Sequence, residues 1–101
     1  MADRLHFYEV ENVMLRISAS EAAGESVTVQ LDGQVSGRWV TLLQGTCEAH
    51  LQKGLRVIVD LRNVSFADRD GIALFRSLKD RQVEFLNALP FIVEQMRKAA
   101  P

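Results

Sequence analysis

The feature that most constrains the fold is a change of hydrophobic period along the chain. Residues 26–32 carry apolar side chains at alternate positions, which is typical of a strand with one apolar face. From Ser36 the apolar residues fall at helical spacing, and residues 55–61 return to a short β-branched run. Such a run is typical of a strand covered on both faces. Strands that alternate with helices favour an α/β fold with some parallel pairing.

The same patterns divide the whole chain into elements. We predict strands at residues 13–18, 26–32, 55–61 and 83–85, with a hairpin loop at residues 19–25 that contains Gly24. The first strand pair is expected to be antiparallel. Helices are predicted after Ser36, near Asp68 and at Pro90, where proline needs no amide donor. The predicted order is β-β-α-β-α-β-α, a single mixed β-sheet covered by helices.

The predicted helix ends and helix faces follow from local chemistry. Ser36 can cap the first helix and Gly54 can terminate it. Each helix has an apolar stripe: Val40, Leu43, Cys47 and Leu51 in the first, Ile72, Phe75 and Leu78 in the second, and Ile92, Val93 and Met96 in the third. Cys47 lies within the first stripe, and we therefore expect it to be a core residue.

Composition excludes several classes of protein. The 101 residues fit one domain, residues 1–101, with no signal-peptide or membrane-spanning run. Twelve basic and thirteen acidic side chains lack the basic excess of a nucleic-acid binder. Residues 1–35 carry two basic and six acidic side chains, whereas residues 36–101 carry ten basic and seven acidic ones, an asymmetry that could steer an acidic partner. A single cysteine fits a reducing cytoplasm.

Residues 57–75 carry a recognisable pattern. An apolar strand ends in Asp60-Leu61, Val64-Ser65-Phe66 follows, and Asp68-Arg69-Asp70-Gly71 opens the next helix. Upstream, an apolar strand leads into Gly33, with Val35 and Ser36 close behind. Together these segments resemble the STAS domain family of bacterial anti-sigma-factor antagonists, over roughly residues 27–97. The resemblance implies a non-catalytic protein whose partner is a kinase-like anti-sigma factor or a larger STAS signalling assembly.

Two positions depart from that family. The residue before Gly71 is the serine or threonine that a partner kinase phosphorylates in such antagonists, and here it is Asp70. Ser36 replaces an acid that usually lies near the phosphorylation site. The resemblance therefore implies that the usual Ser/Thr switch is absent. By its own chemistry, Asp68 can cap the helix and Asp70 can interact with the helix dipole, so a partner-facing role and a purely structural role both stay open.

Trp39 and Leu42 form a second apolar edge on the first helix, offset from its main stripe. Aromatic residues at exposed apolar surface are frequent at interfaces, so this edge predicts partner binding or a homodimer. The alternative is that the N-terminal residues Leu5, Phe7 and Tyr8 cover it. The candidate partner-binding residues are thus Ser36, Trp39, Leu42, Asp68, Arg69, Asp70 and Gly71.

Other chemistry has little support in the sequence. His6 and His50 lack the spacing of metal ligands, and no histidine or phosphate-binding loop accompanies the acids at Asp68 and Asp70. We expect no catalytic residue, no metal and no cofactor. The alternative function is an accessory subunit that stabilises the cytoplasmic ATPase of an ABC lipid transporter, as some stand-alone STAS proteins do. Neither function involves insertion into a membrane.

Overall fold

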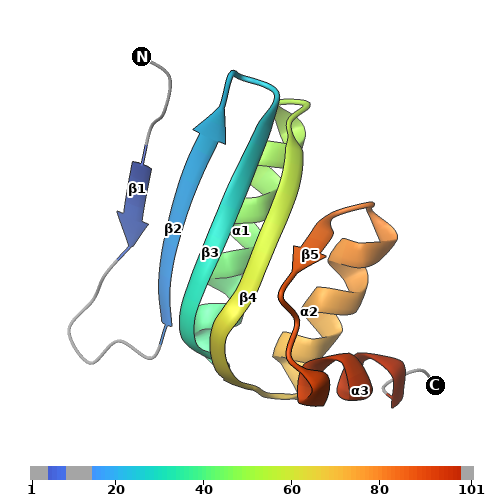
Figure 1. Ribbon diagram of the computed structural model, residues 1–101. Coiled ribbons are helices and arrows are strands. Elements are labelled where there is room, and N and C mark those ends of the chain that lie inside the picture. The colour runs from blue at the N-terminus through green and yellow to red at the C-terminus, as the bar shows by residue number, and fades with distance from the viewer. Residues whose placement is uncertain (1–4, 9–14, 99–101) are drawn as a thin grey trace.

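A computed structural model describes residues 5–8 and 15–98 of the chain. Within them, a five-stranded mixed sheet with strand order β1-β2-β3-β4-β5 packs against three helices (Figure 1). The elements are β1 Leu5–Tyr8, β2 Leu15–Ala22, β3 Ser26–Val35, α1 Arg38–Gln52, β4 Arg56–Ala67, α2 Arg69–Asp80, β5 Glu84–Leu86 and α3 Pro90–Lys98.

The predicted order of elements is confirmed, with one addition. β2 pairs antiparallel with β3, and β3, β4 and β5 are parallel neighbours, so the run at residues 55–61 lies inside the sheet. The addition is β1, which pairs antiparallel with the outer edge of β2. Val13, where the first strand was predicted to begin, lies outside the described residues.

The β2–β3 hairpin is tighter than the predicted loop at residues 19–25. β2 continues to Ala22 because Ala19 is buried and extends the inward alternation of Leu15 and Ile17. The turn is closed by the Glu25 N–H, which donates to the Ala22 carbonyl at 3.0 Å. Ala23 and Gly24 turn the chain with φ angles of 55° and 71°. The pairing of Ala22 with Ser26 leaves a three-residue loop, residues 23–25. Glycine-containing loops of this length are common in hairpins.

The prediction that residues 55–61 are covered on both faces is wrong. In β4, Val57, Val59 and Leu61 are buried, whereas Ile58 and Asp60 between them are only partly covered. α1 and α2 lie against the face that holds the buried residues, α3 packs beside α2, and α1 is seen behind the sheet in Figure 1. The opposite face of β2, β3 and β4 is polar, as expected for a sheet with one solvated side.

The core lies between this face and the three helices. Leu43 and Cys47 of α1, Phe75 of α2 and Ile92 of α3 are fully buried. The Phe75 ring meets the Phe85 ring of β5 edge to face, with centroids 5.6 Å apart. The expectation that Cys47 is a core residue is confirmed, and its burial raises the pKa of the thiol to about 12.

The local signals for helix ends at Gly54 and Pro90 are confirmed. Gly54 has a φ of 80° just after α1, and the N–H groups of Gly54 and Leu55 donate to Leu51 and His50 carbonyls, which is a Schellman ending. α3 begins at Pro90. The cap predicted at Ser36 is wrong. Gly37 occupies the N-cap position of α1, and no side-chain hydrogen bond caps that helix.

Candidate functional site

The carboxyl ends of β3, β4 and β5 meet the starts of the three helices at one end of the molecule (Figure 1). This follows from the parallel order, because β3, β4 and β5 lead into α1, α2 and α3 in turn. In open α/β sheets this end is where ligands bind, since exposed loops and helix starts gather there. Most of the predicted site residues lie on the segments that converge here.

Asp68 joins the starts of α1 and α2. One carboxylate oxygen, Oδ1, accepts the Gly71 N–H at 2.8 Å and caps α2, as the sequence predicted. The other, Oδ2, accepts the Gly37 N–H at 3.1 Å, at the N-cap of α1. The Asp68 N–H in turn donates to the Val35 carbonyl at 3.1 Å. The bond from Gly37 thus ties the start of α1 to Asp68, but it does not cap that helix.

Gly71 is required by a close approach between α2 and β3. A Cβ atom at this position would lie 2.4 Å from the Val35 carbonyl oxygen and 3.1 Å from Val35 Cγ1. The obstructing oxygen belongs to the backbone and cannot rotate away as a side chain could. Glycine therefore lets the start of α2 sit directly against the end of β3, within reach of the Asp68 carboxylate.

Arg69 and Asp70 lie in the first turn of α2 and are exposed. Neither side chain forms a hydrogen bond or ion pair with another described residue. Asp70 therefore presents its charge to solvent at a helix start, where the helix dipole stabilises an anion. The exposure of Asp70 is what a partner-facing role requires, and that role itself stays a prediction.

Phe66 is the site residue that sequence reasoning missed, since it entered only as part of a motif. It is 47% exposed at the end of β4, although strict alternation from Val64 would place it in the core. The register with β3 shifts between Gly33 and Gln34, which pair with Val64 and Phe66 and leave Ser65 as an extra residue. Such an irregularity re-aims side chains, and here it turns Phe66 outward and Ala67 inward.

Trp39 and Leu42 are only partly exposed, and both pack against the core. The guanidinium of Arg38 lies 5.9 Å from the centroid of the Trp39 ring, within the range of a cation–π contact. Trp39 lies in the first turn of α1, next to Gly37. Leu42 lies one turn further along and lines a groove beside Ala19 of β2, so the structure does not place it with the others.

The N-terminal residues proposed to cover this edge form β1, beside β2. The side chains of Leu5, Phe7 and Tyr8 lie outside the described residues, so the alternatives for Trp39 and Leu42 stay as predicted. The described residues contain no group of three or more histidine, cysteine, aspartate or glutamate side chains arranged to hold a metal. No helix in the described part of the chain is long and apolar enough to cross a membrane.

Comparison with solved structures finds proteins of similar architecture. The crystal structure of an anti-sigma-factor antagonist STAS domain from Rhodobacter sphaeroides matches with a TM-score of 0.61 and 16% identity, over 89% of this chain and 96% of that one. The anti-sigma-factor antagonist SpoIIAA in its unphosphorylated form matches with a TM-score of 0.57 and 19% identity, over 93% of this chain and 82% of that one. The chain has a STAS-like fold. Comparison of the sequence with protein-family models finds no match, and comparison with curated proteins finds no significant one.

Within this STAS-like fold, residues 57–75 run from β4 into α2, as the sequence pattern predicted. The backbone next to Ser36 is tied through Gly37 to Asp68, so the two positions that depart from the family lie on segments joined by one carboxylate. We call the exposed or partly exposed residues of this region the helix-start surface: Ser36, Trp39, Phe66, Arg69 and Asp70.

Proposed function

We propose that this chain is a non-catalytic regulatory module that binds a partner protein through the helix-start surface. The observation that carries the proposal is Asp68, whose two carboxylate oxygens hold the starts of α1 and α2 in one arrangement. Phe66 and Asp70 project from segments on either side of this residue. An exposed aromatic ring beside a fixed charge suits protein recognition, because interfaces combine apolar anchors with charged groups that set specificity.

The partner that the resemblance and the fold support best is a kinase-like anti-sigma factor or a STAS signalling assembly of the bacterial cytoplasm. In this proposal the module works without a Ser/Thr switch. Asp70 supplies a permanent single negative charge, whereas a phosphoserine would bring about −1.5 to −2 charges and three acceptor oxygens. Asp70 therefore imitates the phosphorylated state only in part. The partner binds a surface whose charge at this position is not changed by phosphorylation.

The test begins with recovery of the native partner by co-purification, followed by calorimetric titration of variants. Asp70→Asn removes the charge and nearly preserves the shape, so we expect folding to lose only about 0.3–1 kcal/mol through the helix dipole. Loss of a central charged contact should weaken binding by roughly 2–5 kcal/mol. Glu25→Gln is the matched control, because Glu25 is an exposed acid in the β2–β3 hairpin, away from the helix starts.

A second pair of variants tests the apolar part of the surface. Phe66→Ser should weaken binding without a large change in thermal stability, whereas Ile58→Ser, at a partly exposed position on the open face of β4, should leave binding unchanged. Equal affinities of the wild type, Asp70→Asn and Phe66→Ser would refute the helix-start surface as the binding site. Recovery of a permease with its ATPase would instead support the alternative function, an accessory subunit of an ABC transporter.

A companion variant tests how much of the family's recognition surface persists. Asp70→Ser restores a hydroxyl at the phosphoacceptor position, and a kinase-like anti-sigma factor with ATP should then phosphorylate it. We expect weak modification at best, because Ser36 also departs from the family pattern. Phosphate incorporation is measured by intact-mass spectrometry, with the wild-type protein as control. Complete modification of Asp70→Ser would show that Ser36 does not impair recognition.

A further inference from the structure

A second surface with binding character lies between α2, β5 and α3. A groove there is lined by apolar side chains from β5, α3 and the turn before β5, among them Val83, Phe85, Leu86, Val93 and Met96, whereas α2 contributes only charged side chains. Leu86 and Val93 are 44% and 40% exposed. Single exposed apolar residues are ordinary, but two that line one groove with further apolar side chains form a continuous surface of the kind that marks interaction sites.

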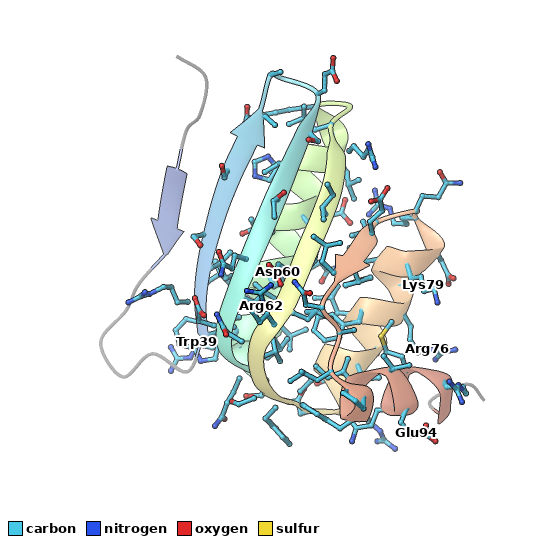
Figure 2. All side chains as sticks on the ribbon, viewed as in Figure 1. Trp39, Asp60, Arg62, Arg76, Lys79 and Glu94 are labelled. Carbon is cyan, nitrogen blue, oxygen red and sulfur yellow. The ribbon has the colours of Figure 1, made fainter. Side chains whose placement is uncertain are left out.

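The rim of the groove is basic on both helices. Arg76 and Lys79 lie one turn apart on α2, and Arg97 lines the groove from α3. Figure 2 shows Arg76 and Lys79 on the same side of α2, far from Trp39. Lys79 is exposed and its ammonium pairs with no other described residue. Its charge is therefore available to a ligand.

The acids at the groove are partly neutralised from outside it. Two groove-lining acids are present, Asp80 and Glu84. The Glu84 carboxylate accepts two bonds from the Arg56 guanidinium, at 3.0 and 2.8 Å, and Arg56 does not line the groove. The Arg97 guanidinium is itself paired with Glu94, at 4.0 Å. Together with these two partners, the groove carries four basic and three acidic groups, a net charge of +1. This local excess attracts an acidic ligand, although the chain as a whole carries a charge of −1.

The geometry of β5 favours a helical ligand over an added strand. β5 is the last strand of the sheet and has three residues. Gln82 and Asn87 flank it with φ angles of 68° and 57°, and the Asn87 amide donates to Asp60 Oδ1 at 3.0 Å. A strand so short and so bounded offers few backbone groups to a pairing peptide, which is how proteins protect sheet edges. The apolar floor between two helices suits an amphipathic helix.

We propose that the groove between α2, β5 and α3 binds an acidic amphipathic helix of a partner protein. The apolar face of that helix packs on Leu86 and Val93, and an acidic residue pairs with Lys79. This surface is separate from the helix-start surface, so the two can engage different segments of a partner or different partners.

The test uses a fluorescein-labelled synthetic peptide of about 15 residues, with leucines at helical spacing and glutamates on the opposite face. Binding is followed by fluorescence anisotropy and by methyl NMR shifts of Leu86 and Val93. Matched peptides carry lysine for each glutamate, or the same residues in scrambled order. We expect saturable binding of the glutamate peptide, a shift of Leu86 and Val93 resonances, and at least about tenfold weaker binding of both controls.

Protein variants locate the site. Lys79→Glu and Val93→Ser should each weaken binding of the glutamate peptide about tenfold or more. Arg62→Glu, an exposed base on β4 away from the groove, should leave it unchanged (Figure 2). Circular dichroism checks that each variant is folded, and Val93→Thr replaces Val93→Ser if the latter unfolds.

Four results would overturn the proposal: no saturable binding, equal binding of the glutamate and lysine peptides, insensitivity to both Lys79→Glu and Val93→Ser, or a bound peptide without helical circular dichroism. Sedimentation velocity examines the remaining occupant, a second copy of the chain. Concentration-dependent dimers that Val93→Ser dissociates would assign the groove to self-association instead. A monomer at all concentrations leaves the groove free for the peptide.

Discussion

Replacement of Gly71 by alanine gives the sharpest test of the arrangement at the helix starts. In a helix, glycine to alanine ordinarily stabilises a protein by roughly 0.5–1 kcal/mol, because alanine has less backbone entropy to lose. At Gly71 the sign should reverse. The added Cβ would lie 2.4 Å from the Val35 carbonyl oxygen, about 1 Å inside ordinary van der Waals contact.

The magnitude follows from what must move. Relief of this contact separates α2 from the end of β3, which overpacking data place at about 1–3 kcal/mol. The same movement stretches the bond from the Asp68 N–H to the Val35 carbonyl, worth about 0.5–1.5 kcal/mol. After subtraction of the helix-propensity gain, we expect Gly71→Ala to lose about 1–3 kcal/mol. For a domain of this size each kcal/mol lowers Tm by roughly 4–8 °C.

Gly45→Ala is the matched control. Gly45 lies inside α1, and a Cβ there meets nothing within 4 Å. This variant should gain about 0.5–1 kcal/mol. Urea and thermal unfolding of both variants, followed by circular dichroism, measure the difference in one buffer. If Gly71→Ala is as stable as the wild type while Gly45→Ala is stabilised, the close approach of α2 to β3 is not as described.

Three further predictions concern Asp68, Cys47 and the Trp39–Leu42 edge. Asp68→Ala should cost about 1–3 kcal/mol in urea unfolding because a cap and the bond from Gly37 are lost together; Asp68→Asn should cost less, and equal losses would count against a capping role. Burial raises the pKa of Cys47 from 9.0 to about 12. The folded state therefore favours the protonated thiol, and this stabilisation is complete below pH 9. Between pH 9 and 12 the free energy of unfolding should fall by up to about 1.4 kcal/mol per pH unit. Cys47→Ala should therefore lose less stability than the wild type between pH 9 and 11, and parallel pH profiles would contradict this. Trp39→Ser combined with Leu42→Ser should weaken association and leave the monomer folded if the edge is an interface; a fall in Tm with no association to lose would assign the edge to the core.

The STAS-like fold and much of its core could be predicted from the sequence because the signals are local. Alternation at residues 26–32, helical spacing around Leu43 and Cys47, and turn chemistry at Gly54 and Pro90 each depend on residues a few positions apart. The same holds for the Asp68 cap on α2, which spans three positions. These periods predict the element order and the antiparallel pairing of the first two predicted strands.

What only the tertiary structure decided depends on residues far apart in the sequence. The second bond of Asp68 reaches Gly37 across 31 positions, so no local pattern in the sequence reveals it. The outward turn of Phe66 results from a register shift against β3, which no pattern within β4 reveals. The open face of β4 was missed because a β-branched run shows that a strand is buried, but not that all helices pack on one side. Such features depend on contacts between segments that are distant in the sequence, so local periodicity cannot predict them.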